Sequence, residues 1–253
     1  MKTPSLSNRG RFRVPAGGAR VGFCRGAVYR RPVIRAVGFD LDDTLAVTDV
    51  DRDVLLARAA EAAGVPSPPD REAYLEAHRR HSGAESREPV FEALVGPADA
   101  AAFAAAYREA VGEALVPVEG AEAVVAELRA RYRVGLLTDG PDDTQRDKLR
   151  RLGWADAFDA VVVTGAIGTP KPDPAAFAAL LESLGVDAAE AVYVGDHPER
   201  DVSGAAAAGL WPVQVLYDGG PDPHPDAAAT LPRSDLRALP GHIEGLGGGH
   251  DDA

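Results

Sequence analysis

The chain of 253 residues and 26.4 kDa has 45% apolar and 26% charged positions, which excludes wholesale disorder and allows one large domain or two small ones. No charge-free stretch reaches the roughly 18 to 20 apolar residues of a membrane-spanning helix, so we expect no membrane segment. The single cysteine, Cys24, excludes an internal disulfide and a thiolate zinc cage, so we expect a protein of the reducing cytoplasm. The formal net charge of −12 repels polyanions, so nucleic acid is not an expected partner of the folded part.

The beginning of the chain differs in charge from the rest. Residues 1–35 carry nine basic side chains and no acidic one, so the other 218 residues together carry −21. Residues 1–32 lack helical or strand periodicity and the apolar segment of a secretory signal, and we predict a disordered basic leader there. Its composition fits a solvated tail, a start codon placed too early, an organelle transit peptide or a nucleic-acid-binding arm, and the sequence leaves these readings open.

From residue 33 onward, short apolar runs alternate with helical patterns. Residues 33–39 form a partly β-branched run that ends in acids, as a buried parallel strand does. The further predicted strands are 133–137, 160–163, 191–194 and 212–216, and the predicted helices between them are 120–131, 143–152, 174–184 and 200–208. This alternation predicts right-handed β-α-β units and therefore an α/β fold with a doubly wound, mostly parallel sheet.

The alternation stops between the first two predicted strands. Four helical patterns, 51–63, 70–81, 85–95 and 97–115, are separated there by segments rich in Gly and Pro, which end helices. We therefore predict a small helical cap domain over residues 47–116, inserted into an α/β core made of residues 33–46 and 117–240. Residues 241–253 are rich in glycine and are predicted to be a flexible tail.

Unusual polar clusters follow four of the strand or loop segments of the predicted sheet. Ligands of open α/β sheets bind outside the carboxyl ends of the strands, so these clusters are the candidate site. They are residues 40–45 (Asp-Leu-Asp-Asp-Thr-Leu), 138–141 (Thr-Asp-Gly-Pro), 171–174 (Lys-Pro-Asp-Pro) and 195–201 (Gly-Asp-His-Pro-Glu-Arg-Asp). Carboxylates at two strand ends predict a site for a hard cation such as Mg²⁺, which prefers oxygen ligands and substrate phosphate.

The order of these motifs resembles that of the haloacid dehalogenase (HAD) superfamily of phosphohydrolases. Asp-x-Asp-x-Thr comes first, then Thr, then Lys-Pro and finally Gly-Asp-x-x-x-x-Asp, and the resemblance covers about residues 34–217. Each motif alone is weak, but together and in this order they carry the resemblance. The position of the predicted cap, between the first two motifs, is similar to that of subfamily I.

The resemblance implies roles for three catalytic residues. Asp40 would be the nucleophile that forms an aspartyl-phosphate, and Asp42 would be the general acid and then the general base. A spacing of two along an extended chain places both carboxylates on one side. Lys171 would stabilise the nucleophile and the phosphoryl charge. The chain has 24 Arg and only three Lys, so a retained lysine indicates a position that needs a compact charge, whereas a helix surface is a sufficient explanation of Lys148.

The resemblance also implies phosphate-binding and metal-binding residues. Thr138 and the backbone of Asp139 and Gly140 would bind the phosphoryl group. The family often has Asn where this chain has Asp139, and because an acid repels phosphate we expect the Asp139 side chain to turn away and cap the next helix. The metal ligands would be Asp40, the backbone carbonyl of Asp42, and Asp196, with Asp201 as a weaker ligand or an orienting group. His197 is expected to be a loop residue without a catalytic role.

These residues favour a magnesium-dependent phosphatase that acts on a small phosphorylated metabolite. The second carboxylate, Asp42, argues against a dehalogenase, and the absence of lysine from the predicted cap argues against a phosphonate-cleaving enzyme. A phosphomutase of the same superfamily and a noncatalytic binding module remain alternatives. The cap segment 78–81 (His-Arg-Arg-His) is either a binding site for an anionic leaving group or a solvated helix face. Monomer and homodimer both remain open.

Overall fold

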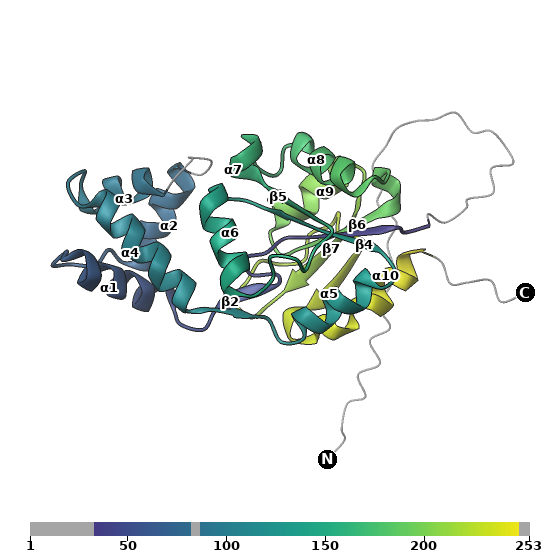
Figure 1. The fold of residues 1–253 in the computed structure, drawn as a ribbon, viewed down its shortest axis with the longest axis horizontal. Coiled ribbons are helices and arrows are strands. Elements are labelled where there is room, and N and C mark those ends of the chain that lie inside the picture. Colours follow the sequence, from purple (N-terminus) through teal and green to yellow (C-terminus); the bar gives the residue numbers. More distant parts are fainter. Residues whose placement is uncertain (1–32, 82–86, 248–253) are drawn as a thin grey trace, which may run out of the picture.

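A computed structural model describes residues 33–81 and 87–247, so the predicted leader, 1–32, and the last six residues lie outside the described part (Figure 1). Its centre is a six-stranded sheet in the order β5-β4-β1-β6-β7-β8, in which all neighbouring strands are parallel. The strands are β1 (Ala36–Phe39), β4 (Arg133–Thr138), β5 (Ala160–Val163), β6 (Ala191–Gly195), β7 (Trp211–Leu216) and β8 (Ala229–Pro232). The predicted α/β fold is confirmed, with β8 as a strand that we did not predict.

Helices cover both faces of this sheet (Figure 1). One face packs against α8 (Pro174–Leu184) and α9 (Gly204–Ala207), and the other against α5 (Ala121–Arg129), α6 (Asp142–Arg151) and α10 (Leu239–Gly247). The short elements α7 (Thr164–Ile167), η1 (Ala188–Glu190), η2 (Pro198–Ser203) and η3 (Arg233–Ala238) complete the connections. The apolar side chains of the two faces form separate clusters, so each layer has its own packed interior.

The register of β1 explains why α8 lies close to the sheet. Gly38 of β1 is paired with Gly135 of β4, so two neighbouring strands present no side chain at this point. The side chain of Leu180 from α8 fills the space, and a Cβ at Gly38 would lie 2.7 Å from the Leu180 Cδ2 atom. Val37 and Phe39 point to the opposite face and are fully buried there. β1 is therefore buried on both sides, as its continuous apolar run predicts.

The end of the described chain is a helix and not the flexible tail that its glycines predict. Leu239 and Ile243 of α10 are four residues apart, lie on one face of the helix and are fully buried against α5 and η3. Burial of this apolar pair compensates for the low helix propensity of the three glycines in α10. The prediction of a flexible tail is wrong for residues 241–247, and residues 248–253 lie outside the described part.

Four helices with a core of their own lie at one end of the molecule (Figure 1). They are α1 (Arg52–Ala63), α2 (Arg71–Arg80), α3 (Glu88–Val95) and α4 (Ala100–Glu113). Their buried side chains, which include Tyr74, Phe91, Phe103 and Tyr107, form a cluster separate from those of the sheet. The chain enters and leaves this bundle, called the cap below, through the antiparallel pair β2 (Ala46–Thr48) and β3 (Leu115–Pro117). The domain limits at residues 47 and 116 stay a prediction.

Within the described ranges, no single helix has both the length and the apolar composition needed to cross a membrane. α3 and α4 reach that composition only when taken together, and they are bent by 117° relative to each other. Their buried residues face the aromatic core of the cap.

The packing of α10 can be tested with two substitutions on the same helix. Ile243→Ala is expected to lower the free energy of unfolding by about 2 to 4 kcal/mol, because it removes a fully buried side chain. Gly241→Ala is expected to raise it by about 0.4 to 1 kcal/mol, because a Cβ there meets nothing within 4 Å and the unfolded chain loses freedom. Urea unfolding monitored by circular dichroism measures both, and two unchanged midpoints would show that α10 does not pack.

Candidate active site

The predicted site residues meet at the carboxyl edge of the three central strands. Asp40 directly follows β1, Thr138 is the last residue of β4, and Asp196 directly follows β6, so neighbouring strands bring them side by side. Lys171 enters from the loop before α8, and Asp201 from η2. Carboxylate oxygens of Asp40, Asp196 and Asp201 all lie within 4.8 Å of one another.

A buried ammonium group joins the two halves of this edge. Lys171 Nζ donates hydrogen bonds to Asp40 Oδ1 and Asp201 Oδ1, both at 2.7 Å, and its side chain is only 2% exposed. It also contacts the hydroxyl of Tyr193 at 3.1 Å, and that hydroxyl donates to the Leu137 carbonyl oxygen. Charge-assisted hydrogen bonds of this length compensate for the burial of the charge.

The charges of this edge are unbalanced. Burial alone would lower the pKa of Lys171, but Asp201 and Asp40 raise it well above its usual range, so the ammonium stays charged. Burial raises the pKa of Asp40 well above its ordinary value; Lys171 opposes this, whereas Asp201 and Asp196 add to it. One lysine thus faces three carboxylates, and a further positive charge would stabilise their ionised forms.

A divalent cation fits this excess of negative charge. Burial, with the charges of Asp201 and Asp43, raises the pKa of Asp196 to about 7. Weak hydrogen bonds from Thr44 Oγ1 at 3.3 Å and from the Tyr217 hydroxyl at 3.4 Å orient the Asp196 carboxylate. Buried carboxylates with only weak donors are a donor set for a hard cation. We conclude that Asp40 and Asp196 are placed to hold such a cation.

Asp201 is occupied differently. Its Oδ1 accepts from Lys171, and its Oδ2 accepts from the backbone N–H of His197 at 2.9 Å, so both oxygens already have partners. It packs directly on the strand end, where a Cβ at Gly195 would lie 2.5 Å from the Asp201 Cβ, so glycine permits this approach. This arrangement favours an orienting role for Asp201.

His197 has a structural function in the same turn. Its Nδ1 atom accepts hydrogen bonds from the backbone N–H groups of Glu199 at 3.3 Å and Arg200 at 3.2 Å. It therefore caps the first turn of η2, the element that carries Asp201. The expectation of a loop residue without a catalytic role does not anticipate this capping.

β4 ends in a polar side chain without a hydrogen-bond partner among the described residues. The Thr138 hydroxyl is fully buried and has no hydrogen-bond partner in the described part of the chain. The carbonyl oxygen of Gly140 accepts from the N–H of Gly165 at 3.1 Å, which ties the loop to α7. A buried hydroxyl without a partner is costly, so a ligand oxygen at Thr138 would stabilise the site.

Contrary to our expectation, Asp139 does not cap the following helix. Its Oδ1 accepts from the backbone N–H of Lys171 at 3.1 Å, and its Oδ2 lies 3.7 Å from the guanidinium of Arg200. The N-cap residue of α6 is Pro141, and no side chain caps it. Asp139 accepts a hydrogen bond from a backbone N–H of the loop that carries Lys171, so the prediction of a helix cap is wrong. The charge of Asp139 faces the guanidinium of Arg200.

A second buried lysine, Lys148, holds Asp42. Its Nζ lies 2.6 and 2.7 Å from the two Asp42 oxygens, and Gln145 Nε2 donates to Oδ2 at 3.1 Å. Partial burial would raise the pKa of Asp42, but the charge and the hydrogen bonds of Lys148 outweigh it and lower this pKa. The Lys148 side chain is 6% exposed, whereas that of Asp42 is 41% exposed.

Lys148 is buried, so the prediction that it lies on a helix surface is wrong. Gln145, Lys148 and Leu149 have the spacing i, i+3, i+4 and form the buried face of α6. Two signals in the sequence point to this arrangement: the apolar partner on the same face, and the rarity of lysine that already singles out Lys171. The contact with Asp42 itself joins residues 106 positions apart and has no local signature.

The cap segment 78–81 divides between surface and interior. Arg80 is exposed and pairs with Glu76 of the same helix. His78 is partly buried, and its ring lies 5.8 Å from that of Tyr74. Burial and the charges of Arg87, Arg200 and Arg52 lower the pKa of His78 to about 4, so it is neutral at pH 7. His78 is thus the member of the segment that lies close to other basic side chains.

Known proteins are similar to this chain in sequence and in fold. A family model described as haloacid dehalogenase-like hydrolase matches residues 34–209. A phosphoserine phosphatase from Thermus thermophilus is 42% identical over 156 residues, which are 60% of this chain and 61% of that protein. A glyceraldehyde 3-phosphate phosphatase from Methanopyrus kandleri is 32% identical over 198 residues, 72% of this chain and 84% of that one. The crystal structure of a HAD phosphatase from Thermococcus onnurineus has a TM-score of 0.62 and 25% identity, and the match covers 82% of this chain and 98% of that chain.

Cation binding at the carboxylates can be measured without any assay of activity. Magnesium at about 100 times its dissociation constant is expected to stabilise the folded protein by about 2.7 kcal/mol and to raise the unfolding temperature. Asp196→Asn should abolish this rise, because it removes one ligand charge, whereas Asp218→Asn, at an exposed acid, should keep it. An equal rise in all three proteins, measured by calorimetry, would place the cation elsewhere.

Proposed function

The chain belongs to the haloacid dehalogenase-like hydrolase family, and we propose that it is a magnesium-dependent phosphatase that hydrolyses a small phosphorylated metabolite through an aspartyl-phosphate. One observation carries this proposal: the carboxylates of Asp40 and Asp42 leave the same strand end, and each is held by its own buried lysine. The site thereby separates a buried carboxylate from an accessible one. The phosphatases among the relatives support a small phosphorylated substrate.

In the first step the Asp40 carboxylate attacks phosphorus, and the bond between phosphorus and the ester oxygen breaks. Lys171 shields the negative charges of the two approaching groups, and the unpartnered Thr138 hydroxyl donates to a phosphoryl oxygen. Magnesium, bound by Asp40 and Asp196, would offset the charge of the phosphoryl group. Asp42 gives its proton to the leaving oxygen, which departs as an alcohol.

In the second step Asp42, now ionised, takes a proton from water, whose oxygen attacks phosphorus and releases phosphate from Asp40. Lys148 favours this ionised form and fixes its position. Asp42 takes up the proton needed for the first step from solvent when the substrate binds, because the negative phosphate close to Asp42 raises the pKa of this carboxyl again. The same carboxylate can therefore act first as acid and then as base.

The first test is a panel of phosphorylated metabolites assayed for phosphate release with and without magnesium. We expect release that depends on magnesium and that Asp40→Asn reduces by at least about 10³-fold, because the nucleophile is lost. The unfolding temperature of Asp40→Asn serves as the control for folding. Release that persists in this variant, or no release from any compound by the natural chain, would contradict the proposal.

A second test concerns Lys148 and compares two leaving groups. Lys148→Met is expected to lower kcat/KM for alkyl phosphates by about 10- to 100-fold, because their alkoxide needs a proton from a correctly placed Asp42. The loss should be smaller for p-nitrophenyl phosphate, whose leaving group departs without a proton. Arg150→Met removes a 62% exposed charge from the same helix and should change neither substrate. Equal losses for both substrates would show that Lys148 does not act through Asp42.

A further inference from the structure

Two arginines of the cap are held by tyrosines in a crosswise arrangement. Arg52 Nη1 donates to the Tyr107 hydroxyl at 3.0 Å, and the Arg52 guanidinium lies 5.1 Å from the centre of the Tyr74 ring. Arg87 donates to the Tyr74 hydroxyl, and its guanidinium lies 5.8 Å from the centre of the Tyr107 ring. Both tyrosines belong to the aromatic core of the cap, so the two guanidinium groups have fixed positions.

Neither arginine has a carboxylate partner among the described residues, although both are partly buried. Other arginines of this protein do pair with acids, for example Arg108 with Asp143 at 2.9 Å and Arg151 with Glu109 at 2.6 Å. Asp42 and Asp43 act on these two charges only from beyond ion-pair distance, and the aromatic contacts offset only part of the cost of burial. Arg52 and Arg87 therefore lack a direct anionic partner, which a ligand would supply.

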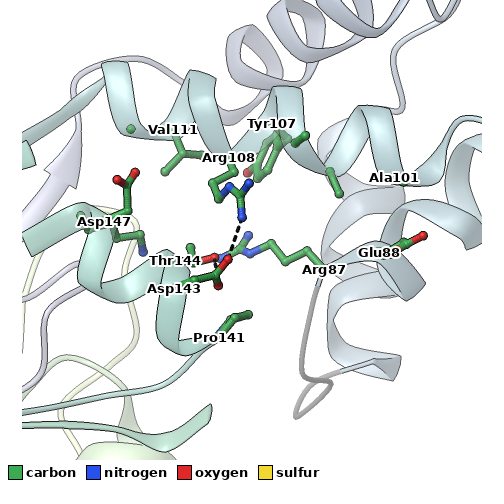
Figure 2. A pocket seen from close by; sticks show the side chains of 14 residues that line it. Arg87, Glu88, Ala101, Tyr107, Arg108, Val111, Pro141, Asp143, Thr144 and Asp147 are labelled. Atoms are coloured by element: carbon green, nitrogen blue, oxygen red, sulfur yellow. Dashed lines mark hydrogen bonds and ion pairs between the residues drawn. The ribbon is translucent and has the colours of Figure 1, made fainter. Parts of the chain in front are cut away.

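An anion bound by Arg87 and Arg52 would lie beside the leaving group of the substrate. Arg87 lines a cavity of about 430 Å³ between α4 and α6 (Figure 2). The same cavity is lined by Lys148, which holds Asp42. In Figure 2 the Arg87 side chain extends from the cap toward the first turn of α6, near Asp143 and Thr144. The cavity thus extends from Arg87 to the lysine that holds the proposed proton donor.

The walls of the cavity limit what else the ligand contains. The α4 wall includes the small apolar side chains of Ala101, Ala104 and Val111, which suit a short carbon chain, whereas the acids Asp143 and Asp147 line the α6 side. Asp42 and Asp43 lie close enough for their charges to act on Arg87 and Arg52, respectively. They repel a dianion more strongly than a monoanion, which favours a carboxylate over a second phosphate. Two planar guanidinium groups also match a carboxylate in geometry.

We propose that Arg87 and Arg52 form a second anion site, which binds a carboxylate on the leaving group, so that the substrates are phosphate monoesters of short hydroxy acids. The inference rests on the proposed phosphatase function and specifies its substrate class. The phosphoryl group is bound by the sheet edge, and the carboxylate is bound by the cap. Neutral His78 adds a polar group near the two arginines without adding charge.

The kinetic test compares esters that differ only in the anionic group. Each pair consists of a hydroxy-acid ester and the matching diol ester: 3-phosphoglycerate with glycerol 3-phosphate, and phosphoglycolate with 2-hydroxyethyl phosphate. The natural chain should prefer the carboxylates by at least about 10-fold in kcat/KM. Arg87→Gln should lower kcat/KM for the carboxylates by about 10- to 100-fold, and that for the diol esters by less than about threefold.

Arg80→Gln is the matched control, because Arg80 belongs to the same cap but does not line the cavity, is 70% exposed and pairs with Glu76. It should leave both classes of ester unchanged. Arg52→Gln should repeat the pattern of Arg87→Gln. Equal losses for carboxylates and diol esters would show that the arginines bind the transferred phosphoryl group or only stabilise the cap. A preference for ethylene glycol bisphosphate that Arg87→Gln removes would overturn the carboxylate in favour of a second phosphate.

A binding measurement separates this inference from the proposed function. Glycerate, which has the carboxylate but no phosphoryl group, is titrated into the Asp40→Asn variant by calorimetry. We expect binding that the added substitution Arg87→Gln weakens by at least about 10-fold. This result would support the anion site even if no ester is hydrolysed. Glycerate binding that Arg87→Gln leaves unchanged, or no glycerate binding at all, would overturn the site even if phosphatase activity is found.

Discussion

The geometry of the site depends on the ammonium group of Lys171. Carboxylates of Asp40, Asp196 and Asp201 are buried within 4.8 Å of one another, and at this distance their ionised forms repel strongly. Lys171 lies 2.7 Å from two of them and joins the loop before α8 to the ends of β1 and β6. Without this charge, burial would protonate the carboxylates, and an acid can neither attack phosphorus nor bind a cation well. The carboxylates of this sheet edge are therefore arranged around the ammonium group of Lys171.

A second lysine gives two carboxylates that are only two residues apart different electrostatic environments. Asp40 is buried and its pKa is raised, whereas Asp42 is accessible and its pKa is lowered by Lys148 from α6. The proposed roles need the opposite protonation states, which a cation at Asp40 and the substrate phosphate beside Asp42 would supply. Two of the three lysines of this chain are used in this way, and among the described residues the exposed Lys or Arg side chains are all arginines.

The sequence predicts what is local and misses what depends on distant contacts. The strands buried on both faces and the motifs that follow them are found, because periodicity and the strand end fix where Asp40, Thr138 and Asp196 lie. β8 is missed because it is an edge strand with one fully buried residue, Leu231. The environment of Lys148 and the direction of Asp139 are missed because they depend on partners 106 and 32 positions away.

The aromatic core of the cap gives its arginines a property that surface arginines lack. The Tyr74 and Tyr107 rings lie 5.3 Å apart and are themselves packed against Phe91, so the guanidinium groups they hold lose little freedom when an anion binds. The phosphoryl site is equally rigid, because it is built on strand ends. A substrate that contacts both must bridge a nearly fixed distance, so its length would be selected together with its charge. In a chain whose net charge is −12, such preorganised cations allow a small dianionic or trianionic metabolite to bind where the average charge would repel it.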